Sequence, residues 1–116
     1  MELVHTCYRI TDPGRSVAFY EALGLEKRRE LPIRDEAMNY FLGVPGKEQP
    51  ELELTYNFGV DSYELGTAYG HIALTIDSMD DTLASLAEKG IEKFVSSFDQ
   101  VLQRIGATQR HLTAAA

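Results

Sequence analysis

The pattern of apolar and polar residues along the chain predicts alternating strands and helices. Residues 3–10 (LVHTCYRI) are rich in β-branched, aromatic and leucine side chains and end at a TDPG turn, which is typical of a strand. Asp12 is suited to cap a helix that has Pro13 in its first position, and Gly24 is suited to end it. Turn signals then separate three shorter predicted strands, at 25–31, 37–44 and 50–58.

The last of these strands has two chemically different faces. In ELELTYN, alternation places Leu52, Leu54 and Tyr56 on one face. The opposite face carries polar side chains, namely Glu51, Glu53, Thr55 and Asn57. A strand with one side in water explains this pattern, and Glu51 is interpreted as an exposed strand carboxylate. A further role for Glu53 depends on what the rest of the chain supplies.

The second half of the chain repeats the first. Residues 69–77 (YGHIALTID) predict a strand, SMDDTLASLAEKG predicts a helix capped by Ser78, and 91–97 predict another strand. A shift of 66 residues places His71 on His5 and Gly90 on Gly24. A strand, helix and strand that stay in register indicate duplication of one unit. The sequence therefore predicts an α+β fold made of paired βαβββ modules.

The second module is incomplete by this register. A second copy of ELELTYN would begin one residue past position 116, and FDQVLQRIGATQRHLTAAA has helical spacing instead. The expected organisation has three parts. Residues 1–63 form the first βαβββ module, 64–97 form the start of the second (strand, helix, strand), and 98–116 form a divergent helical tail.

Composition narrows the class of protein. The 116 residues carry a formal net charge of −7, which disfavours binding to nucleic acid and to anionic membranes. Cys7 is the only cysteine, so an intrachain disulfide is excluded. Neither a signal peptide nor a membrane span is recognisable. We expect a soluble cytoplasmic protein.

Three side chains suggest a metal site. His5 and His71 occupy equivalent places in the two repeats, so two modules related by a pseudo-two-fold axis would bring both imidazoles to one point. Glu53 can join them from the polar strand face. Two histidines and a carboxylate are typical ligands of Zn, Ni, Fe or Mn and leave positions open for water or substrate.

Two segments resemble glyoxalase I (lactoylglutathione lyase) of the vicinal oxygen chelate superfamily. They are HTCYRITDPGRSVAFYEALGL and LELTYNFGVDSYELGTAYGHIAL, and the resemblance covers about residues 1–91. It implies a cupped sheet around a metal, usually Ni or Zn. It also implies isomerisation of the methylglyoxal–glutathione hemithioacetal to S-lactoylglutathione. In the family, the metal holds the two substrate oxygens and stabilises an enediolate while a glutamate moves a proton between adjacent carbons.

The resemblance also assigns residues. The positions that match metal ligands are His5, Glu53 and His71, with Glu53 the catalytic carboxylate among them. The positions that match groups holding the carboxylates and amides of glutathione are Arg9, Thr55 and Asn57. Arginine suits that role because its guanidinium can pair with a carboxylate through two hydrogen bonds. In bacterial-type members the sites form between two chains, which implies a homodimer that shares its ligands.

One family feature has no counterpart in this sequence. The fourth ligand is a glutamate in a segment resembling DPDGY.IEL, and nothing after Gly90 matches it. In the family this glutamate is also the principal base, so membership and activity are separate questions. The alternatives are a catalytically impaired metal-binding member, or another enzyme of the superfamily such as an extradiol dioxygenase or a thiol transferase. The TYN sequence after Glu53 favours the glutathione-dependent enzyme.

Overall fold

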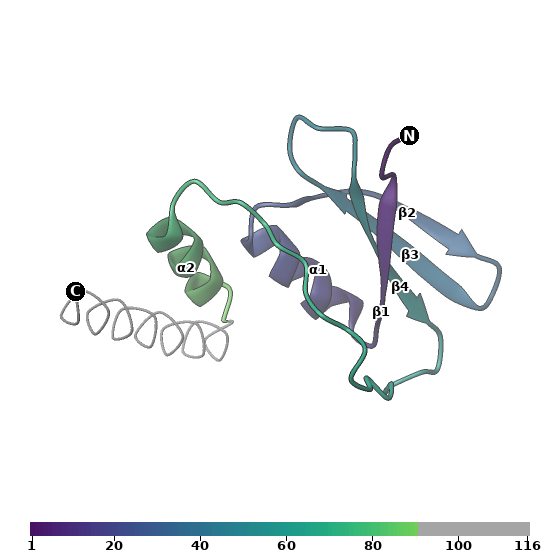
Figure 1. Cartoon of the computed structure of the whole chain (residues 1–116). Coiled ribbons are helices and arrows are strands. Elements are labelled where there is room, and N and C mark those ends of the chain that lie inside the picture. Colours follow the sequence, from purple (N-terminus) through teal and green to yellow (C-terminus); the bar gives the residue numbers. More distant parts are fainter. Residues whose placement is uncertain (91–116) are drawn as a thin grey trace.

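The computed structural model describes residues 1–90, which form a four-stranded sheet with two helices on one side (Figure 1). In chain order the elements are β1 (His5–Ile10), α1 (Pro13–Ala22), β2 (Glu26–Ile33), β3 (Ala37–Gly43), β4 (Glu51–Asn57) and α2 (Met79–Glu88). The strands lie in the order β1-β4-β3-β2. β4 is parallel to β1 and antiparallel to β3, which is antiparallel to β2. This is the predicted βαβββ unit, and the mixed α+β fold is confirmed.

The helix boundaries follow from local capping. The side chain of Asp12 accepts a hydrogen bond from the Arg15 backbone N–H at 3.1 Å, and Pro13 occupies the first turn of α1. Ser78 caps α2 in the same way, accepting from the Asp81 N–H at 3.2 Å. Gly24 follows α1 with a φ of +106°, a left-handed conformation that other residues adopt at a cost.

The hydrophobic core lies between the sheet and α1. Leu42, Leu52 and Leu54 are at most 6% exposed and come from the central strands β3 and β4. Around them pack the partly buried residues Tyr8, Ile10, Val17, Tyr20, Leu25 and Tyr40. Because α1 covers this face, the polar face of β4 lies on the opposite side of the sheet, which no helix of residues 1–90 covers (Figure 1).

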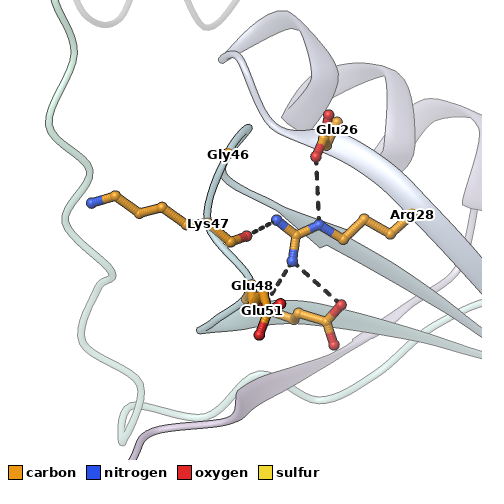
Figure 2. A pocket seen from close by; sticks show the side chains of 6 residues that line it. All are labelled: Glu26, Arg28, Gly46, Lys47, Glu48 and Glu51. Atoms are coloured by element: carbon orange, nitrogen blue, oxygen red, sulfur yellow. Dashed lines mark hydrogen bonds and ion pairs between the residues drawn. The ribbon is translucent and has the colours of Figure 1, made fainter.

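The loop between β3 and β4 is held by Arg28 of β2 (Figure 2). Its guanidinium donates to three backbone carbonyl oxygens of this loop, those of Val44, Lys47 and Glu48. A Cβ atom at Gly43 would overlap the guanidinium, so the absence of a side chain there leaves room for Arg28. These contacts border a pocket of about 460 Å³ and fix the chain just before β4 begins. Its lining residues are Glu26, Arg28, Gly46, Lys47, Glu48 and Glu51.

The strand predicted at 69–77 is absent from the described chain. No strand occurs between β4 and α2, and none of the four strands pairs with this segment. Ile72, Leu74 and Ile76 alternate along it and are 39%, 44% and 37% exposed. Alternation supplies one apolar face, but a strand also needs a neighbour for its N–H and C=O groups. The prediction was therefore wrong for residues 1–90 by themselves.

Other expectations fall outside what the structure describes. The strand predicted at 91–97 and the helical tail at 98–116 lie beyond residue 90, so the division into 1–63, 64–97 and 98–116 stays a prediction. Neither α1 nor α2, the helices of the described part, is long and apolar enough to cross a membrane.

Candidate metal and substrate site

The uncovered face of the sheet gathers polar side chains from β1 and β4. Alternation places His5, Cys7 and Arg9 of β1 on this face. β1 pairs in parallel with β4, where Cys7 lies opposite Glu53. Residues that are 48 positions apart in the sequence thereby become neighbours, as the 3.3 Å contact between Cys7 Sγ and Thr55 Oγ1 shows.

His5 of the edge strand β1 and Glu53 of the adjacent strand β4 come together on this face. His5 Nε2 lies 3.2 Å from Glu53 Oε2, and the two side chains are 46% and 13% exposed. An imidazole nitrogen and a carboxylate oxygen are both ligands of borderline divalent ions. Two ligand atoms that are each about 2.1 Å from one ion at a right angle lie about 3 Å apart. This pair therefore fits two adjacent positions around a single cation.

The second oxygen of Glu53 is held by one residue of the neighbouring strand β3 and one residue of β4 itself. Asn39 Nδ2 of β3 donates to Glu53 Oε1 at 2.7 Å, and Thr55 Oγ1 donates to the same oxygen at 3.3 Å. Asn39 is 8% exposed. The sequence interpretation missed Asn39, although an amide inside the otherwise apolar run AMNYFLG was a usable signal. Glu53 therefore offers one anchored oxygen and one oxygen that faces His5.

His71 does not join this pair in the described chain. No group of three or more histidine, cysteine, aspartate or glutamate side chains within residues 1–90 is arranged to hold a metal. The segment before His71 is attached to the helix-covered face, where the hydroxyls of Tyr69 and Tyr8 are 3.2 Å apart. The pKa of Tyr8 is raised to about 12. The largest cause is this hydrogen bond, and the second is the burial of the hydroxyl. His71 is exposed and follows Tyr69 by two residues, so one chain presents two of its three predicted ligands together.

The predicted substrate-binding residues have different surroundings. Arg9 is exposed on the site face and has no ion-pair partner among residues 1–90, so its guanidinium is available to an anionic ligand. Thr55 contacts Glu53 and Cys7, as described above. Asn57 Nδ2 donates to the Tyr63 hydroxyl at 2.9 Å. All three lie along one side of Glu53, on the same sheet face, and their role toward a substrate stays a prediction.

Glu51 is buried, which corrects its interpretation as an exposed carboxylate. Arg29 Nη1 of β2 donates to Glu51 Oε1 at 2.6 Å, and Arg28 Nη1 is 3.6 Å from the same oxygen. Arg29 also lies over the Phe41 ring, with its Cζ atom 3.8 Å from the centroid. The hydrogen bond from Arg29 is the main cause that lowers the pKa of Glu51. Glu51 is therefore tied to β2 and forms no part of the pair with His5.

A Glu51→Gln variant should have a free energy of unfolding about 1 kcal/mol lower at neutral pH, because the charge-assisted hydrogen bond from Arg29 is lost. The effect is expected to be no larger because Arg29 is half-exposed, and solvent screens its charge. The pKa of Glu51 lies below its ordinary 4.5, so the carboxylate stabilises the fold above that pH. This stabilisation is lost as the pH falls through the folded-state pKa. Urea midpoints of wild type and variant should converge between about pH 7 and about pH 3. A constant difference would contradict the assignment.

Comparison with known proteins places this arrangement in a family. A sequence model of the Glyoxalase/Bleomycin resistance protein/Dioxygenase superfamily matches residues 2–112. The chain belongs to this superfamily. It is 42% identical over 93 residues to a lactoylglutathione lyase of Escherichia coli O157:H7, across 78% of this chain and 69% of that protein. A probable chloroplastic lactoylglutathione lyase of Arabidopsis thaliana is 37% identical over 91 residues, covering 76% of this chain and 26% of its own length.

Solved structures of the superfamily agree with the fold. The trypanothione-dependent glyoxalase I of Leishmania major superposes with a TM-score of 0.66 at 38% identity, over 76% of this chain and 66% of that one. A glyoxalase I variant from Zea mays gives a TM-score of 0.65 at 32% identity, over 77% and 33% of the two chains. This chain thus matches about two thirds of the length of the bacterial and Leishmania proteins.

Proposed function

We propose that this protein is a glyoxalase I-type lyase that isomerises the methylglyoxal–glutathione hemithioacetal to S-lactoylglutathione. The observation that carries the proposal is the pair formed by His5 Nε2 and Glu53 Oε2, 3.2 Å apart on the uncovered sheet face. The 42% identity to a bacterial lactoylglutathione lyase supports the same reaction class. Nickel or zinc is the proposed ion, because both accept imidazole and carboxylate ligands.

A divalent cation, when bound, would polarise the substrate oxygens as a Lewis acid. The residues of this chain have separate tasks. His5 and Glu53 would hold the ion from one side. Glu53 would take the proton from the carbon that bears sulfur and return it to the neighbouring carbon. The hydroxyl proton on the first carbon would pass to the oxygen on the second, so that the hemithioacetal becomes the thioester without loss or gain of atoms. The hydrogen bonds from Asn39 and Thr55 keep the carboxylate oriented for this transfer.

The glutathione part of the substrate would lie beside Glu53 along β1 and β4. Arg9 is an exposed cation that no carboxylate neutralises within the described part of the chain, and its fork suits a substrate carboxylate. Thr55 and Asn57 follow on the same face and supply hydroxyl and amide groups. The order of these residues along the strands would align an extended peptide with one end at the metal.

A complete site is proposed to form between two copies of the chain. His71 of a second copy would supply the third ligand, because His71 of the same chain follows a segment attached to the other face. β1 is an edge strand of the sheet, and the apolar alternation of residues 69–77 is exposed. Unpaired strand edges and exposed apolar stripes both favour pairing with another chain. The proposed assembly is a homodimer with shared ligands.

The proposed reaction should be observed directly as thioester absorbance. Metal-stripped protein is supplied separately with Ni²⁺ and Zn²⁺ and given methylglyoxal with glutathione. We expect turnover that depends on both the ion and the thiol. Because one structural relative is trypanothione-dependent, trypanothione is the matched alternative thiol. Metal binding without turnover with either thiol would refute the lyase and leave a catalytically impaired metal-binding protein.

A further inference from the structure

Asn39 is placed to control how Glu53 meets a metal ion. Its side chain lies on β3, opposite Thr55 of β4 in the strand register, and reaches diagonally to Glu53. The 2.7 Å separation from Nδ2 to Oε1 is short for a hydrogen bond from an amide to a carboxylate. Because an ionised carboxylate can only accept, the amide nitrogen of Asn39 must be the atom that faces it.

The contacts of Glu53 divide its two oxygens. Oε1 accepts from Asn39 and, at 3.3 Å, from Thr55, whereas Oε2 faces His5 at 3.2 Å. A carboxylate without such anchors could rotate and offer either oxygen, or both, to an ion. With Oε1 engaged, Oε2 is the oxygen left for the ion, already beside the imidazole. Partners of this kind, outside the ligands themselves, commonly change metal affinity 10- to 100-fold.

One atom of Asn39 is unfavourable for stability, which distinguishes a role in orienting Glu53 from a role in stabilising the fold. Its Oδ1 atom is buried and has no hydrogen-bond partner among the described residues. A buried acceptor without a partner lowers stability. Replacement of Asn39 by leucine, which has the same branched shape, removes this acceptor together with the donor. The loss of this unpaired acceptor offsets the cost of leaving Glu53 Oε1 with the hydrogen bond from Thr55 alone, so the fold should tolerate the change while Glu53 loses its anchor.

We propose that Asn39 is a positioning residue that holds Glu53 Oε1 and presents Oε2, together with His5, to the metal. The inference rests on the proposed metal site but requires no turnover. In Asn39→Leu, the dissociation constant for Ni²⁺, measured by calorimetry on the metal-stripped full-length protein, should rise about 10- to 100-fold. The urea midpoint of the metal-free protein should change little, because the lost acceptor of Asn39 and the lost donor to Glu53 have opposite effects on stability. With saturating Co²⁺ as a probe, the visible spectrum of the variant should differ from that of wild type, since the carboxylate can turn.

Two further variants make the test decisive. Asn39→Ala also removes the donor and introduces no added volume, so it replaces the leucine variant if that one fails to fold. Tyr40→Phe is the matched control, because it removes a hydroxyl from the next residue of β3, which contacts the core on the other face. Equal Ni²⁺ affinity and identical Co²⁺ spectra in wild type and both Asn39 variants would overturn the inference alone. Absence of Ni²⁺ binding by wild type would overturn the proposed function as well.

Discussion

A Glu53→Gln variant is expected to lose about 10²- to 10⁴-fold in turnover, because the group that moves the substrate proton is removed. Metal affinity should fall in parallel, since the amide replaces an anionic ligand beside His5, 3.2 Å away. The fold should persist, because the glutamine carbonyl can still accept the hydrogen bond from Asn39. Thioester formation, Ni²⁺ calorimetry and urea unfolding together measure these three quantities.

The control for Glu53→Gln is the same substitution at Glu51. Glu51 lies two residues earlier on the same face, yet its carboxylate is bound to Arg29 at 2.6 Å and lies outside the pair. Glu51→Gln should change stability and leave metal affinity intact, whereas Glu53→Gln should do the opposite. If Glu53→Gln bound Ni²⁺ as tightly as wild type, this glutamate would be no ligand and the site would have to be sought elsewhere.

The first module was predictable because its signals are local. Strict alternation along β4 separates Leu52 and Leu54 in the core from Glu53 on the open face. Asp12 and Gly24 mark the ends of α1 through capping and a left-handed backbone, which depend only on neighbouring residues. The three shorter strands lie within a few residues of their predicted ranges.

The errors concern features that depend on distant partners. Residues 69–77 have the alternation of a strand, but a strand forms only where another segment pairs with it. Glu51 was misinterpreted because its partner Arg29 reaches it from β2, two strands away across the sheet. That neighbour is fixed by the lateral order of strands, which alternation does not encode.

The candidate site was predictable only where its residues follow from local patterns. The repeat drew attention to His5, and alternation placed Glu53 on the polar face, and these two side chains do meet. Asn39 was missed because its strand is otherwise apolar, which indicates a core strand and not part of a site. Its contact with Glu53 depends on the register between β3 and β4. His71 was expected to converge with His5, but a ligand shared between chains would leave no trace in the geometry of one chain.

Mixing two inactive variants should restore activity if the site is shared between chains. His5→Ala and His71→Ala each remove one predicted ligand, and both side chains are exposed enough for the fold to tolerate the change. In a homodimer of either variant, both sites lack a ligand. In a heterodimer, one site lacks both histidines and the other is intact.

Heterodimers are isolated by placing a different affinity tag on each variant and purifying through both in turn. We expect about half the wild-type turnover per dimer and about half the Ni²⁺ bound, because a symmetric dimer has two equivalent sites. The parent variants, treated identically, should show neither. If His5 and His71 of one chain formed the site together, no combination of these variants would contain an intact site, and the heterodimer would be as inactive as its parents. Recovery therefore tests the position of His71 and the assembly in one experiment, since it requires two chains and a ligand from each.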